Sequence, residues 1–117
     1  RGAGWSLPPN LTPNYSGNGG LCASADALAR WTRALWSHRI LDAAQKAEML
    51  KVEPVAHGYT PPYGFGVSVN PIAGFQAISH SGSGDGWGAW AAYLADHDMT
   101  IVILTNRGWF WATDLGA

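Results

Sequence analysis

The first half of the chain carries apolar residues at helical spacing. Leu28, Trp31 and Leu35 recur at intervals of three and four residues, which places them on one face of a helix. Ser24 precedes this run and has the side chain of a helix N-cap. The pattern predicts a helix over residues 24–37, with the three apolar side chains packed against other parts of the protein.

A second helix is predicted shortly after the first. Asp42 and Gln45 have the spacing of a capping box, in which each side chain accepts from the other residue's backbone N–H. The alanine-rich run that follows extends to Leu50, and Pro54 prevents its continuation. We expect residues 24–53 to form a pair of helices that pack against each other.

The second half of the chain has the alternation and turn residues of an antiparallel sheet. Strands are expected over residues 63–69, 75–81, 89–95 and 99–105, separated by Asn70-Pro71 with Gly74 and by the polar turn Asp96-His97-Asp98. The last of these strands, Met99 to Thr105, is apolar on both faces, so we expect it to be central in the sheet. The fold class is therefore α+β, with an antiparallel sheet of about four strands preceded by the helix pair.

The remaining segments lack a regular pattern and define the domain organisation. Residues 1–117 are expected to form a single partial domain with a loop over 1–23, the helix pair over 24–53, strands over 63–106 and the start of a C-terminal helix over 107–117. The glycine- and proline-containing stretch 55–62 is expected to be a loop. Because the chain begins with Arg1 rather than Met, we expect it to be a processed or truncated piece of a longer product.

Composition narrows the function classes. Among 117 residues 47% are hydrophobic, seven are tryptophan and 13% are charged, which is too apolar for a disordered segment. A formal net charge of −1 without a basic stripe argues against nucleic-acid or anionic-membrane binding. The longest apolar strand is too short to span a bilayer, and a single cysteine, Cys22, excludes an internal disulfide.

The run from Phe75 to Gly86 combines a strand with the chemistry of a site. Its alternating part ends in His80, Ser81 and Gly82, which bring an imidazole, a hydroxyl and a residue without Cβ to the end of a strand. A ligand's backbone or carboxylate can lie close to such an edge. The plain alternative is an imidazole that only hydrogen-bonds a neighbouring loop, followed by a flexible turn over Ser83 to Gly86.

Four runs of the chain, in this order, resemble the serine β-lactamase and penicillin-binding-protein superfamily, most closely its class C and esterase-like branch. They are Gly19 to Trp31, which is similar to the Gly-Gly-Leu and Asp-Leu-Ala-Arg helix start, Tyr63 to Gly66, His80 to Gly82, and Ile101 to Asn106. The third run resembles the family's Lys-Thr-Gly or His-Ser/Thr-Gly active-site strand. The match implies the C-terminal third of a β-lactamase-like, transpeptidase-like fold.

The resemblance implies an acyl-transfer hydrolase of the β-lactamase, D-alanyl-D-alanine carboxypeptidase or esterase type, without a cofactor. His80, Ser81 and Ser83 would be catalytic, and with Gly82 they would bind the substrate, the Ser83 N–H serving as one of two oxyanion donors. The substrate would be a small molecule or a peptidoglycan-like peptide. A periplasmic or extracellular location would follow.

The family's other catalytic motifs have no match in this sequence. No serine is followed three places on by lysine, so the Ser-x-x-Lys nucleophile is missing, and no tyrosine begins a Tyr-x-Asn element. Neither Ser81 nor Ser83 lies in Gly-x-Ser-x-Gly. The isolated chain is therefore expected to be inactive, and the alternative is a non-catalytic binding or assembly module that retains part of this fold.

Two further groups of residues have ordinary interpretations. The spacing of His38, His57, His80 and His97 fits no metal-ligand pair, so no metal site is predicted. Core packing is the expected role of the aromatic residues Trp31, Trp36, Trp87, Trp90, Trp109 and Trp111, although Trp87 follows the glycine turn and is placed to line a pocket mouth. Since the final strand would be exposed in a bare monomer, we expect a homo-oligomer whose interface includes Trp109 or Trp111 and the final strand.

Overall fold

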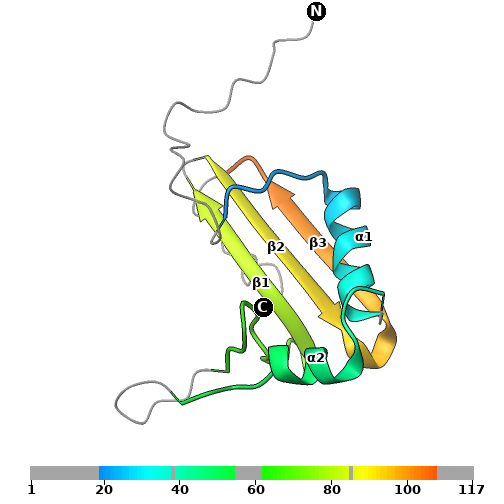
Figure 1. Ribbon diagram of the computed structural model, residues 1–117. Coiled ribbons are helices and arrows are strands. Elements are labelled where there is room, and N and C mark those ends of the chain that lie inside the picture. The colour runs from blue at the N-terminus through cyan, green and yellow to red at the C-terminus, as the bar shows by residue number, and fades with distance from the viewer. Residues whose placement is uncertain (1–18, 38, 55–61, 85, 108–117) are drawn as a thin grey trace, which may run out of the picture.

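The computed structural model describes residues 19–37, 39–54, 62–84 and 86–107. Two helices precede a three-stranded antiparallel sheet, which confirms the α+β class and the order of elements (Figure 1). The elements are α1 (Ala25–Trp36), α2 (Ala43–Met49), β1 (Ala77–Gly84), β2 (Trp87–Leu94), the short 3₁₀ helix η3 (Ala95–His97) and β3 (Met99–Thr105). Three expected segments lie largely outside the described residues: residues 1–18 of the loop over 1–23, residues 55–61 of the loop over 55–62, and residues 108–117 of the helix start over 107–117.

Both helices begin at the caps that the sequence predicts. The Ser24 side chain accepts a hydrogen bond from the Ala27 N–H at 3.2 Å. Asp42 accepts from the Gln45 N–H at 2.8 Å, and the Gln45 side chain accepts from the Asp42 N–H at 2.9 Å. Each cap satisfies backbone donors that have no partner within the helix. Local side-chain chemistry therefore fixes where α1 and α2 start.

The sheet has the order β1-β2-β3, and both strand pairs are antiparallel. Ala77 lies opposite Leu94, and Leu94 in turn lies opposite Met99, so these three residues share one end and one face of the sheet. The predicted bounds of the last strand are confirmed. The strand expected over 75–81 begins two residues later and continues to Gly84, because the Ser83 and Gly84 positions still pair with β2.

The strand expected over 63–69 is wrong. Tyr63 and Ser68 pair with each other in a single bridge, and Ser68 forms another single bridge with Ser79 of β1. The Gly64 N–H donates to the Val67 carbonyl at 2.8 Å, and Gly66 has a φ of 80°, so the segment folds back on itself. Glycine favours this turn because other residues are strained at positive φ. The described sheet therefore has three strands rather than about four.

The expectation that the final strand is central is also wrong for the described part of the chain. The central strand is β2, and β3 pairs with β2 alone. Apolar side chains on both faces of a strand predict that other parts of a protein cover both faces. They do not determine how many strands pair with its edges.

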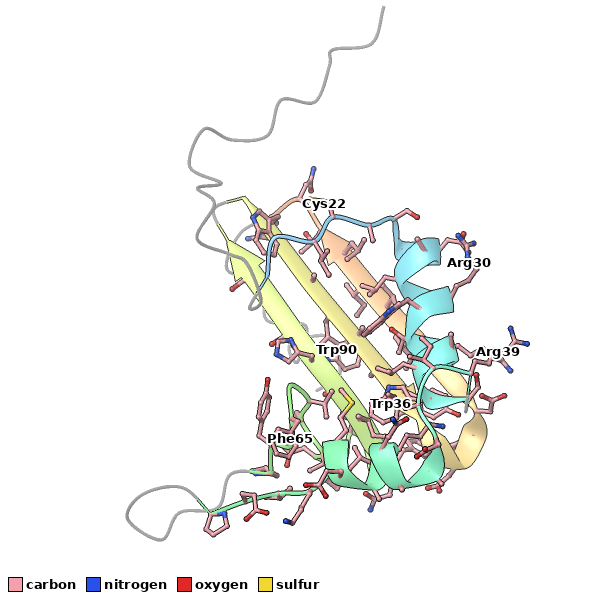
Figure 2. All side chains as sticks on the ribbon, in the orientation of Figure 1. Cys22, Arg30, Trp36, Arg39, Phe65 and Trp90 are labelled. Atoms are coloured by element: carbon pink, nitrogen blue, oxygen red, sulfur yellow. The ribbon has the colours of Figure 1, made fainter. Side chains whose placement is uncertain are left out.

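The core lies between α1 and one face of the sheet. Leu35, Trp36, Val67 and Tyr93 form its buried cluster, and the rings of Trp36 and Tyr93 stack with centroids 6.4 Å apart. Figure 1 shows α1 running along the β3 side of the sheet, and Figure 2 labels Trp36 near the C-terminal end of this helix. Trp31 was expected in the core but is 55% exposed, because the buried face of α1 is made by Thr32, Leu35 and Trp36 instead. The core role predicted for Trp36 is confirmed.

The two helices meet through a buried lysine. Lys46 of α2 is 8% exposed, and its ammonium donates to the carbonyl of Trp36, the last residue of α1, at 2.6 Å. Carbonyls at a helix C-terminus lack intrahelical partners, and a cation is favourable there because the helix dipole is negative at that end. Lys46 therefore joins α2 to α1 and satisfies the end of the first helix.

A second polar contact joins α1 to the turn between β2 and β3. Asp98 has a left-handed backbone with a φ of 46°. It accepts from the Tyr93 hydroxyl at 3.1 Å and from the Arg33 guanidinium at 2.5 Å. Burial, with a smaller contribution from the hydrogen bond and charge of Asp98, raises the pKa of Tyr93 above its ordinary value of 10.0, and Arg33 opposes this.

This contact predicts a loss of stability in alkaline solution. A raised pKa means that the folded state favours the protonated phenol of Tyr93. The contribution of this group to the free energy of unfolding is therefore fully present below pH 10 and is lost as pH rises through the raised pKa. Urea midpoints measured between pH 9 and 11 should fall more steeply for the wild type than for Tyr93→Phe. The pKa of Lys51, raised by Glu53, affects both proteins equally, so equal slopes would contradict the prediction.

Candidate functional site

The His-Ser-Gly run lies within β1, at the edge of the sheet that is opposite β3. His80, Ser81, Gly82 and Ser83 are all exposed, and His80 lies opposite Ala91 of the central strand. The imidazole of His80 lies beside the ring of Tyr63, with centroids 6.0 Å apart and planes inclined by 59°. The candidate site is therefore an accessible strand rather than a part of the core.

The backbone of β1 alternates between its two neighbours. The backbone N–H and C=O of Ser79 both point away from β2. The N–H donates to the Ser68 carbonyl at 2.9 Å, and the carbonyl accepts from the Ser68 N–H at 2.7 Å. In an antiparallel strand the residues two and four positions further on point the same way. The N–H and C=O groups of Ser81 and Ser83 thus face the edge away from β2, whereas those of His80 and Gly82 face β2.

Hydrogen-bonding groups are consequently presented in a row beyond the Ser68–Ser79 bridge. Within the described residues this bridge is the pairing found on the outer side of β1. An extended molecule can add to such an edge by main-chain hydrogen bonds, which is a common mode of peptide recognition. Ser81 and Ser83 each offer one donor and one acceptor for that purpose.

The side chains of the run divide between the two faces of β1. Because neighbouring residues in a strand point to opposite faces, His80 and Gly82 lie on one face and Ser81 and Ser83 on the other. The face of His80 also carries Ile78, which packs against the core beneath α1. A ligand at the strand edge therefore meets the outward backbone groups of Ser81, with the His80 imidazole on one face of β1 and the Ser81 hydroxyl on the other.

Two aromatic residues near His80 were not identified as a group from the sequence. Trp87 was expected mainly in the core, but it is 40% exposed and its indole lies over Gly84, directly opposite in the sheet. Tyr63 carried no predicted role beyond the family motif, and it is 42% exposed. These two exposed rings lie near the His-Ser-Gly run because of the pairing of β1 with β2 and of Ser68 with Ser79. The local sequence does not specify either pairing.

The histidines do not gather around a common point in the described part of the chain. His97 packs edge-on against Phe75, with ring centroids 5.0 Å apart, while His80 lies near Tyr63. His38 and His57 lie outside the described residues. No group of three or more metal-ligating side chains occurs in the ranges that the structure describes.

None of the helices in the described part of the chain has the length and apolar character needed to cross a membrane.

Two capped helices followed by a three-stranded antiparallel sheet with an exposed His-Ser-Gly edge are consistent with a partial β-lactamase fold. A family model described as Beta-lactamase matches residues 1–109. The chain therefore belongs to the β-lactamase family.

Curated relatives agree with this membership at low identity. The chain is 25% identical over 100 residues to proteins named D-aminopeptidase from Brucella ovis and Brucella canis, and 23% identical to one from Brucella anthropi. Each match covers 86% of this chain and 19% of the relative. The chain thus spans about a fifth of the length of the curated relatives it matches.

Proposed function

We propose that this chain forms the C-terminal wall of the active site of a serine β-lactamase-like hydrolase that acts by acyl transfer on an amide, lactam or ester. The observation that carries the proposal is the outward-facing backbone of Ser81 and Ser83 beside the exposed His80. Membership of the β-lactamase family supports it.

Each residue of the edge has a role in this proposal. A serine from outside the described chain attacks the substrate carbonyl and displaces the leaving group, forming an acyl-enzyme that water then hydrolyses. The Ser83 N–H donates to the oxyanion that develops on the carbonyl oxygen. His80 and Ser81 orient the substrate, and Gly82 permits its close approach to the strand because it has no side chain.

The substrate class follows from the relatives only as a proposal. Their name, D-aminopeptidase, makes a peptide with a D-residue a candidate substrate for this chain as well. A peptide of that kind can extend along β1 by main-chain hydrogen bonds, whereas a compact lactam would use fewer of them. We therefore place a D-residue peptide or amide, including a peptidoglycan-like peptide, ahead of other small molecules.

The alternating backbone predicts an alternating response to a ligand. Titration of the ¹⁵N-labelled chain with N-acetyl-D-alaninamide should shift the amide signals of Ser81 and Ser83, because their N–H groups face the open edge. The Gly82 amide, which faces β2, should move much less and serves as the internal control. Equal shifts along the whole run, or none at millimolar ligand, would contradict the proposal.

A second candidate function is a non-catalytic binding or assembly module. It is favoured by the sequence itself, which contains neither Ser-x-x-Lys nor Tyr-x-Asn. Mass spectrometry after incubation with a fluorophosphonate or a penicillin discriminates between the two. A covalent adduct on a serine of this chain would show an enzyme complete in itself, whereas the acyl-transfer proposal expects labelling only when a chain with the nucleophile is present.

We also propose that copies of this chain associate through the β3 edge. In the described part of the molecule β3 has one strand neighbour, and its Met99 and Leu104 side chains are 49% and 40% exposed. The expected contribution of Trp109 and Trp111 lies outside the described residues. Sedimentation equilibrium at micromolar concentration should give a mass above that of the 12.5 kDa monomer, and a monomeric, cooperatively folded species would contradict the proposal.

A further inference from the structure

The indole of Trp87 lies directly on the backbone of β1. A Cβ built on Gly84 would lie 2.5 Å from two atoms of the indole, and a Cβ on Gly82 would lie 3.7 Å from the far end of its six-membered ring. The ring therefore extends from Gly84 toward Gly82. His80 is the next residue on this face of β1 beyond Gly82, so the indole ends next to the histidine position.

Tyr63 approaches His80 from the outer side of β1. Its segment reaches β1 through the Ser68–Ser79 bridge, and its ring centroid is 6.0 Å from that of the imidazole. Tyr63 and Trp87 keep 42% and 40% of their surface exposed. His80 is thus bracketed by two large rings, one over the glycines of β1 and the other across its edge.

The exposed parts of these two rings provide an apolar surface on either side of His80. Aromatic side chains bind apolar groups by area burial and by ring stacking, and binding sites combine such surfaces with a few well-placed polar groups. The polar groups are the outward amides of Ser81 and Ser83. Apolar rings and main-chain donors therefore lie along the same short stretch of strand.

We propose that Tyr63 and Trp87 form an apolar subsite that determines specificity, binding an aromatic or large aliphatic side chain of the substrate beside His80. This inference rests on the proposed function, because it assigns the substrate's backbone to the β1 edge. Gly84 has a positioning role: the absence of a side chain there allows the indole to lie flat on the strand.

The test compares two ligands that share a backbone and differ in side chain. The ¹⁵N-labelled chain is titrated with N-acetyl-D-phenylalaninamide and with N-acetyl-D-alaninamide, and the Trp87 indole N–H signal is assigned from its loss in Trp87→Phe. We expect the phenylalanine ligand to bind about 10-fold more tightly, a typical discrimination for an apolar pocket. Equal affinities, or no binding of either ligand at millimolar concentration, would overturn the subsite.

Variants separate the subsite from general effects on folding. Trp87→Ala and Tyr63→Ala should each reduce the preference to roughly 2-fold or less, while Trp87→Phe should keep most of it because an aromatic face remains. Gly84→Ala should also weaken the preference by displacing the indole, without removing it. Phe65→Ala is the matched control, since Phe65 is 60% exposed, and Figure 2 shows it beside β1 and close to α2.

The outcomes distinguish this inference from the proposed function. If both ligands shift the Ser81 and Ser83 amides with equal affinity, the substrate edge is supported and the subsite is refuted. If only the Trp87 indole signal moves and does so selectively, the aromatic surface is supported while the edge is refuted. A preference that survives Trp87→Ala and Tyr63→Ala together, in variants that retain dispersed spectra, would assign the selectivity to other residues and overturn the inference.

Discussion

Ser83→Pro is expected to lower kcat by about 10²–10³-fold in an enzyme that combines this chain with a nucleophilic serine, because it removes one oxyanion donor. Proline has no N–H, and the N–H of Ser83 faces the open edge rather than β2. The sheet therefore keeps its hydrogen bonds, since proline is tolerated on an edge strand when its nitrogen faces outward. The loss should appear in the chemical step measured in single turnovers.

Ser83→Ala is the control for this substitution. It removes the hydroxyl but keeps the N–H, so its kcat should stay within a few-fold of the wild type. Thermal melting of both variants checks that β1 remains folded. If Ser83→Ala were as inactive as Ser83→Pro, the hydroxyl rather than the amide would be the functional group, and the assignment of the oxyanion donor would fail.

The helices and the last strand could be predicted from the sequence because their determinants are local. Ser24 and Asp42 fix the helix starts through hydrogen bonds that span three residues. Met99 to Thr105 is an uninterrupted run with strand-forming residues, and its bounds match β3. None of these features depends on how distant parts of the chain meet.

The errors in the sheet arose where distant contacts decide the structure. Residues 63–69 alternate large and small residues as a strand does, but the turn at Gly64 to Val67 directs the segment against the end of α2. The lateral position of β3 depends on which strands are available to pair, and hydrophobic alternation contains no information about that. Periodicity predicts which residues are covered but not by what.

The candidate site was predictable as a run of residues but not as a surface. His80, Ser81 and Gly82 could be placed on a strand from their sequence context. The outward direction of the Ser81 and Ser83 amides follows from the Ser68–Ser79 bridge, which joins residues eleven positions apart. The position of Trp87 over Gly84 requires the register of β1 with β2, which no local pattern specifies.

The contact of Gly64 with α2 is the basis for the largest stability effect that we expect. A Cβ on Gly64 would lie 2.3 Å from the carbonyl oxygen of Met49, the last residue of α2, and 3.2 Å from backbone atoms of Leu50. The same carbonyl accepts from the Phe65 N–H at 2.8 Å. Backbone therefore packs against backbone, and a methyl group has no room because neither side can rotate away.

Gly64→Ala should destabilise the protein by about 3 kcal/mol or more, at the upper end of the cost of overpacking, because the 62–69 segment must move off α2. That is a large fraction of the roughly 5–15 kcal/mol that stabilises a domain. Gly66→Ala is the matched control: it introduces strain at a φ of 80° but meets no atom within 4 Å, so about 1–2 kcal/mol is expected. Urea unfolding measures both costs, and hydrogen exchange of the Phe65 amide should accelerate in Gly64→Ala more than global unfolding requires. Equal costs for the two variants, with Phe65 still protected in both, would show that the segment can shift and that its close contact with α2 does not hold Val67 in the core.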